Sequence, residues 1–170
     1  VFNQAFKPKA DRITSLASTK ALLDTPMPAQ ISSTFAWDIE SSPGYLLETA
    51  PRGASLRLLL DERGSLDWRV ALKITCSLAR SLEWMDNQGV VHRALQPEAI
   101  HITDIQKGYA NLTEWALGVL AYQEDPLEAL KKGNLIASAA YMAPELITSA
   151  GGADRKSSIY SLGLLLYEML

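Results

Sequence analysis

The chain has 170 residues, 48% of them hydrophobic and 21% charged, with a formal net charge of −3. These values are typical of one ordinary globular domain, and they exclude a strongly basic surface for nucleic acid and a long acidic tail. The single cysteine, Cys76, excludes an internal disulfide and so favours a reducing compartment.

The ends of the sequence bear on where the protein resides. The first residues, V-F-N-Q, lack the basic and apolar regions of a signal peptide. The most apolar stretch, residues 162–170, is far too short to cross a bilayer. We therefore expect a cytoplasmic location, with no membrane contact from this segment.

The first part of the chain predicts one helix and two strands. Residues 14–23 are rich in Leu, Ala and Lys and favour a helix that ends before Pro26, because proline cannot continue it. Residues 35–40 and 45–48 are typical of short strands. The sequence S-S-P-G between them predicts a hairpin turn.

The remainder predicts mostly helices. Ser55 can cap a short helix over 56–62, and Asp67 can cap a longer one that runs to about Asn87. Apolar residues recur along the longer helix at helical spacing and predict one buried face: Ala71, Ile74, Leu78, Leu82 and Met85. Candidate strands at 99–102 and 109–112 flank a turn, and a buried helix is expected at 157–170. The expected fold class is α+β.

Residues 91–100 read V-H-R-A-L-Q-P-E-A-I, and residues 112–116 read L-T-E-W-A. They resemble the catalytic loop V-H-R-D-L-K-P-E-N-I and the metal loop L-T-D-F-G of eukaryotic-type Ser/Thr protein kinases. These two and three further segments stand in the order in which that family carries them. Residues 140–145, A-Y-M-A-P-E, match the end of the activation segment, and 158–163, S-I-Y-S-L-G, the start of the central helix. Residues 45–56 are similar to the fifth strand, the hinge and the following helix.

The resemblance covers about Tyr45 to the end of the chain, while the first forty residues match loosely. It implies a protein-kinase-like fold in which residues 1–50 form part of the N-lobe, up to the hinge. Residues 51–170 would then form the mostly helical C-lobe, truncated within the central helix. An isolated segment of this kind would leave the apolar face of that helix open, so we expect it to be poorly soluble.

The resemblance breaks at the residues that carry the family's chemistry, which needs a positioned nucleophile and neutralised phosphate charge. Ala94 replaces the proton-accepting aspartate, Gln96 the lysine that contacts the phosphate, and Ala99 the magnesium-binding asparagine. The metal-loop aspartate becomes Glu114, a weak candidate ligand, because it is one methylene longer and magnesium demands tight octahedral geometry. The aspartate that anchors the catalytic loop from the central helix is Ser158.

The N-terminal match leaves its register open. If V-F-N-Q corresponds to the family's V-A-I-K strand, the phosphate-pairing lysine is Gln4, and its glutamate partner falls near Leu16 or Ala17. The chain can equally begin just after that lysine. The family's glycine-rich phosphate loop would precede residue 1.

The matching positions that keep the family's residue type are structural. His92 and Trp115 correspond to a histidine and an aromatic ring that the family stacks together. Tyr141 and Met142 correspond to a shelf that faces the substrate. Retained shape combined with lost polar chemistry is what a scaffold or an allosteric partner would show.

We therefore predict a catalytically inactive kinase-like domain, a pseudokinase, that docks a protein partner or regulates a linked domain in signalling. No cofactor or metal is expected, although the hinge residues Glu48, Thr49 and Ala50 leave metal-independent ATP binding open. The alternative is a divergent but active Ser/Thr kinase that transfers the γ-phosphate of ATP to protein hydroxyls. It would use Glu98 or Glu114 in new roles.

Overall fold

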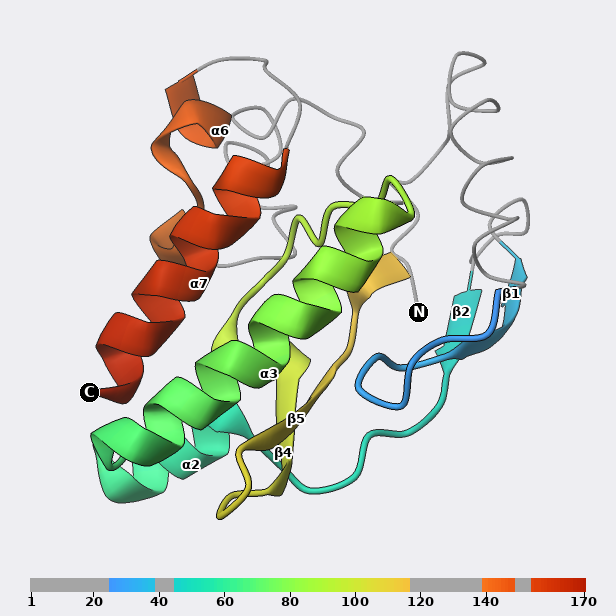
Figure 1. Cartoon of the computed structure of the whole chain (residues 1–170). Helices are drawn as coiled ribbons and strands as arrows, with labels where there is room; N and C mark the ends of the chain where they lie inside the picture. The colour runs from blue at the N-terminus through green and yellow to red at the C-terminus, as the bar shows by residue number, and fades with distance from the viewer. Residues whose placement is uncertain (1–24, 39–44, 117–138, 149–153) are drawn as a thin grey trace.

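The computed structural model of the chain describes residues 25–38, 45–116, 139–148 and 154–170 (Figure 1). The helix expected at 14–23 and the expectations for Gln4, Leu16 and Ala17 lie outside the described residues. The described elements are short strands and longer helices that follow one another in groups, which confirms the α+β class.

The N-terminal part of the described chain forms a two-stranded antiparallel sheet. Strand β1 (Thr34–Asp38) pairs with β2 (Tyr45–Glu48), with Thr34 opposite Glu48 and an irregularity in register between Thr34 and Ala36. The two predicted strands are thus confirmed. The first begins one residue earlier than expected.

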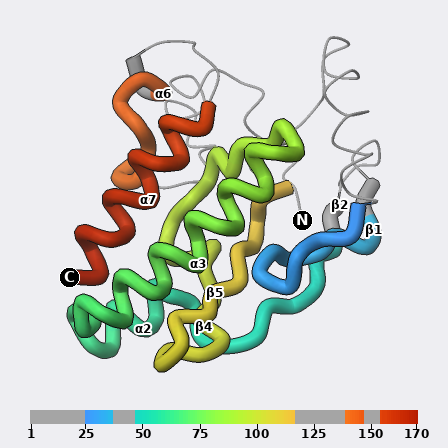
Figure 2. Tube along the Cα trace, viewed as in Figure 1, coloured from blue at the N-terminus to red at the C-terminus, as the bar shows by residue number. Residues whose placement is uncertain are grey.

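A second sheet has the strand order β3-β4-β5 and is antiparallel throughout. Its members are β3 (Ala54–Ser55), β4 (Ile100–Asp104) and β5 (Tyr109–Leu112). The segment before β1 lies against the end of β5 (Figure 2), because Ser32 N donates to Leu112 O at 2.8 Å. The strands predicted at 99–102 and 109–112 are confirmed as β4 and β5, whereas β3 was not predicted. The turn predicted at 41–44 lies outside the described residues.

Two of the three longer helices pack against the second sheet, and the third packs against one of these two helices. Helix α2 (Leu56–Arg63) is capped by Ser55, which accepts from Leu58 N, and α3 (Trp68–Asn87) is capped by Asp67, as predicted. Helix α7 (Arg155–Met169) begins earlier than expected, because Asp154 and Ser157 form a reciprocal capping box. Figure 1 shows α7 alongside α3, with the β4–β5 hairpin against the other side of α3.

The core lies on the predicted face of α3, whose five apolar residues are all buried. Helix α7 buries Leu162, Leu165 and Met169 against this core, but Ile159 is 56% exposed and Tyr167 81%. The helix predicted at 157–170 is therefore buried on one face only, and its other face is exposed. Among the described residues, no helix has both the length and the apolarity needed to cross a bilayer.

Shorter elements complete the described chain. A 3₁₀ turn, η2 (Pro97–Ala99), precedes β4. A second turn, η3 (Ala139–Tyr141), is followed by helix α6 (Pro144–Thr148). These elements lie within the motifs that resemble the catalytic loop and the end of the activation segment.

Gly53 holds the connection from the hinge to α2 close to β4. Its φ is +85°, and an added Cβ would lie 1.9 Å from Ile102 O. Gly64 has a similar φ of +78° but nothing within 4 Å. We expect Gly53→Ala to lower the free energy of unfolding by about 3 kcal/mol and Gly64→Ala by about 1 kcal/mol. Urea denaturation would measure both, and equal losses would contradict the close approach at Gly53.

Candidate functional site

The segment that resembles the catalytic loop is buried at the positions of the family's reactive side chains. Ala94 and Ala99 are fully buried, and Gln96 is 8% exposed. Each alanine presents only a methyl group, which can neither accept a proton nor bind a metal ion. The structure thus places these three predicted residues in one short, packed loop.

Thr113 connects this loop to the segment that resembles the metal loop. Its backbone N–H and its hydroxyl both donate to the carbonyl oxygen of Ala99, at 2.9 and 3.1 Å. Its own carbonyl oxygen lies 2.9 Å from Nε2 of His92. A carbonyl oxygen can only accept, so His92 Nε2 carries the proton and donates it. Burial lowers the pKa of His92, which keeps the ring neutral.

Glu114 follows directly and has a strained backbone. Its φ of +61° makes it the only described non-glycine residue with positive φ, a conformation that costs about 1 kcal/mol. Burial raises the pKa of Glu114, and the nearby charge of Glu98 raises it further. Glu114 is therefore partly buried.

Glu48 at the end of β2 joins the hinge to Glu114 through its side chain. Its Oε2 accepts from the backbone N–H of Glu114 at 3.1 Å and from the Ser32 hydroxyl at 3.2 Å. Its Oε1 is buried and has no hydrogen-bond partner among the described residues. Burial raises the pKa of Glu48, and the charge of Glu114 adds to this shift, although the two hydrogen bonds oppose it.

The hinge offers fewer free backbone groups than the sequence predicted. The backbone N–H of Thr49 donates to Ser33 O at 2.8 Å, and its hydroxyl donates to the same oxygen. This N–H is therefore already used within the protein. Ala50 is exposed. Adenine contact by the hinge stays a prediction.

Trp115 fixes the other side of the metal-loop segment. Its ring is 1% exposed, and Nε1 donates to Ser32 O at 2.9 Å. His92 is equally buried. Both side chains are therefore buried, and their stacking on one another stays a prediction.

A second polar cluster lies at the predicted substrate-facing shelf and was not predicted. Arg57 forms ion pairs with Glu168, with Asp61 at 3.3 Å and with Glu98 at 3.4 Å. It also donates to the Tyr141 hydroxyl at 2.9 Å, and that hydroxyl donates to Glu168. Burial and the bond to Glu168 raise the pKa of Tyr141 to about 12. The cluster joins α2, η2, η3 and α7.

The described side chains do not offer the donor set that a magnesium ion needs. Within the described residues, no group of three or more His, Cys, Asp or Glu side chains is arranged to hold a metal ion. Of the two positions that bind magnesium in the family, Ala99 has no ligand atom and only Glu114 has a carboxylate. This pair does not fit a magnesium ion, which takes oxygen ligands in near-octahedral geometry.

Replacing Arg57, the cation at the centre of the second polar cluster, tests how much that cluster contributes to stability. We expect Arg57→Met to lower the free energy of unfolding by about 2 kcal/mol, because three carboxylates lose their shared cation in a half-buried site. The matched control is Arg69→Met, whose pair with Asp67 spans 3.9 Å and is exposed. It should cost less than about 0.5 kcal/mol. Urea denaturation measures both, and equal costs would show that the cluster contributes no more than a surface pair.

The Glu48 side chain gives a pH-dependent prediction. Its folded pKa lies above the unfolded value of 4.5, so the native state is favoured by protonation and loses this contribution as pH rises through the folded pKa. At pH 7 we expect Glu48→Gln to stabilise the fold by about 1 kcal/mol, the order of the cost of one buried unpaired acceptor. The gain should shrink towards zero below pH 4.5.

Thermal unfolding of the wild-type protein and the Glu48→Gln variant between pH 4 and 8 measures this difference. Glu62→Gln on the exposed side of α2 is the matched control and should change nothing at any pH. A gain for Glu48→Gln that does not depend on pH would contradict the charged, buried carboxylate.

Comparison with known proteins identifies the fold family. Residues 21–170 match the model of the family described as "Protein kinase domain". A probable serine/threonine-protein kinase of Clostridium perfringens is 30% identical over 128 residues, which are 74% of this chain and 18% of that protein. Serine/threonine-protein kinase PknL of Mycobacterium tuberculosis is 32% identical over 126 residues, 74% of this chain and 30% of PknL. The chain thus spans less than a third of the length of these relatives.

The fold agrees with a solved kinase structure. The crystal structure of Rad53 (residues 1–466) in complex with AMP-PNP superposes with a TM-score of 0.66 at 20% sequence identity, and the match covers 92% of this chain and 37% of that one. At this identity the likeness supports the fold alone. Taken with the family match, the motifs and the fold, it leaves one conclusion: this chain is part of a protein kinase domain and belongs to that family.

Proposed function

We propose that this domain is catalytically inactive, a pseudokinase that acts as a protein-docking or allosteric regulatory module in signalling. The observation that carries the proposal is the pair of fully buried methyl groups, Ala94 and Ala99, inside a loop that keeps its hydrogen bonds to Thr113. The loop is held in shape while the groups for proton acceptance and metal binding are missing.

The charges around the metal-loop segment support the same proposal. Phosphoryl transfer depends on cations that neutralise the phosphate oxygens. Here the described neighbourhood of Glu114 contains two further carboxylates, Glu48 through a hydrogen bond and Glu98 through its charge. Gln96, at the position of the family's lysine, is neutral. Such a group of carboxylates repels a triphosphate instead of attracting one.

The proposed division of the chain follows the family. Residues 1–50 would be the N-lobe portion up to the hinge, and residues 51–170 the C-lobe portion. The Glu48 side chain joins the two, because it bonds Ser32 and the backbone of Glu114. A connection of this kind is suited to a module that transmits a conformational change to a linked domain or a docked protein without nucleotide.

A divergent active kinase is the second candidate, and one observation favours it. Glu98 and Glu114 are close enough for the charge of one to raise the pKa of the other, so a cation between them would relieve their repulsion. Against this, Glu98 already pairs with Arg57 at 3.4 Å. The remaining donor set does not complete a magnesium site.

A nucleotide-binding and phosphotransfer experiment separates the two candidates. We expect the intact protein that carries this domain to show no magnesium-dependent rise in melting temperature with ATP. It should transfer no γ-phosphate to a protein substrate, because the proton acceptor and metal ligands are absent. Differential scanning fluorimetry with ATP, with and without magnesium, and a radiolabelled phosphotransfer assay measure these outcomes.

Glu114→Gln and Glu98→Gln serve as matched variants in the same assays, with an active serine/threonine kinase domain as the positive control. Under the proposal both variants behave like the wild-type protein. A magnesium-dependent shift together with phosphotransfer that either variant abolishes would establish the divergent enzyme. A nucleotide shift that needs no magnesium, without phosphotransfer, would agree with binding at the hinge alone.

A further inference from the structure

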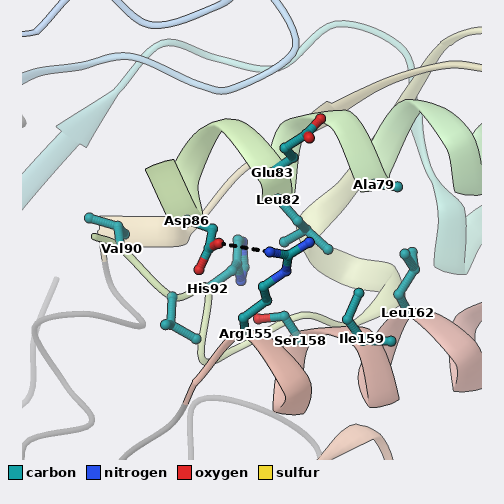
Figure 3. A pocket seen from close by; sticks show the side chains of 11 residues that line it. Ala79, Leu82, Glu83, Asp86, Val90, His92, Arg155, Ser158, Ile159 and Leu162 are labelled. Carbon is teal, nitrogen blue, oxygen red and sulfur yellow. Dashed lines mark ion pairs between the residues drawn. The ribbon is translucent and has the colours of Figure 1, made fainter. Parts of the chain in front are cut away.

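A cavity of about 50 Å³ lies between the second half of α3 and the first two turns of α7 (Figure 3). The apolar part of its wall includes Leu82, Val90 and Leu162, and its polar groups include those of His92 and Ser158. This volume is about a third of that of an engineered cavity that holds benzene, roughly 150 Å³. The cavity therefore has room for a few waters or one very small organic molecule.

His92 lines this cavity, and its ring carries an unpaired acceptor. Its Nε2 donates to Thr113 O, so in the neutral ring Nδ1 carries a lone pair. That atom is buried and has no hydrogen-bond partner in the described part of the chain, and the residue is only 1% exposed. An unpaired buried acceptor costs about 1–3 kcal/mol, which a ligand that donates a hydrogen bond would recover.

The surrounding charges select against an ionic ligand. Asp86 and Arg155 pair across the cavity at 3.6 Å, and Figure 3 shows this pair in front of His92. Glu83 adds a second acidic group to the lining, so the net charge disfavours an anion. A cation at Nδ1 would have to leave water for the buried part of the site, which is costly. A neutral ligand that donates a hydrogen bond is not repelled by the charge of the lining and brings no ionic group that must lose its water.

We propose that this cavity is a binding site for a short-chain alcohol, whose O–H donates to His92 Nδ1 and whose alkyl group packs on the wall. The hydroxyl of Ser158 lies in the lining and can donate to the oxygen of the same ligand. Water takes this place when no alcohol is present. The site is independent of the proposed function, because it uses neither the nucleotide cleft nor the hinge.

A ligand of about three heavy atoms binds weakly, and its dissociation constant is bounded near the millimolar range. Binding would nevertheless have a defined structural effect. Because His92 is bonded to Thr113, and Thr113 to Ala99, a ligand at Nδ1 would strengthen the connection between the catalytic-loop and metal-loop segments.

NMR of the intact, ¹⁵N-labelled protein tests the site directly. The chain has two histidines, and His101 Nδ1 is also buried without a partner but does not line this cavity, so it is an internal control. Titration with ethanol should move the ¹⁵N resonance of His92 Nδ1 saturably and leave that of His101 unchanged. Acetonitrile, which has the same number of heavy atoms but only accepts hydrogen bonds, should produce no saturable shift.

Four variants make the result specific to the cavity. Ala79→Leu adds bulk to the cavity wall and should abolish the ethanol response, and Ile159→Trp at its exposed edge should weaken it severalfold. Arg80→Leu adds the same side chain at the adjacent exposed position outside the cavity and should leave the response intact. Ser158→Ala should weaken binding severalfold, since it removes only the second hydrogen bond.

The outcomes are distinct. A saturable response confined to His92, lost in Ala79→Leu or weakened in Ile159→Trp, supports the site. A His92 Nδ1 resonance that reports a hydrogen bond but ignores ethanol would mean that water alone occupies the cavity, which overturns the proposal. Equal responses to acetonitrile, or equal shifts at His101, would overturn it as well.

Discussion

The geometry of the candidate site depends on Thr113. Its backbone N–H and hydroxyl donate to Ala99 O, and its carbonyl oxygen accepts from the ring of His92. Two of these three bonds end on the backbone oxygen of Ala99. A backbone acceptor is present whatever the side chain is, so the shape of the catalytic-loop segment does not depend on an asparagine at position 99. Catalytic side chains can therefore be replaced in this loop at little cost to the fold.

The loss of catalytic side chains is accompanied by a hydrogen bond between two distant segments, which the side chain of Glu48 accepts. Its carboxylate accepts from the backbone of Glu114, whose left-handed conformation directs that N–H towards β2. The bond fastens the strained residue to the end of the hinge strand. The arrangement is destabilised by a buried oxygen that has no partner among the described residues and by two carboxylates that lie close together. A protein that needed a triphosphate between these elements would gain nothing from this arrangement.

The sequence predicted those elements whose stability is local. Helix α3 follows from its apolar stripe and from Asp67 at its start, and the β4–β5 hairpin from its turn. Strand β3 has two residues and exists only through its pairing with β4, which no local pattern reveals. The same limit applies to the site. Glu48 and Glu114 are 66 positions apart, and Arg57 and Glu168 are 111 apart. Glu48 was predicted as part of the hinge because its strand was recognised, but the direction of its side chain depends on tertiary contacts.

The substituted positions differ in how the surrounding protein has adapted. Ala94 and Ala99 are fully buried, and neither lines either of the two cavities that Ser158 lines. Ser158 instead lies between two cavities, both of which also touch His92. Empty volume lowers stability by an amount that grows with its size, and an unpaired nitrogen adds to that loss. A small ligand that fills the space and donates a hydrogen bond recovers part of both losses in stability. At Ser158 the side chain is shorter than the family's aspartate, and the surrounding residues leave empty space. Filling that space is therefore itself a source of binding free energy for a ligand.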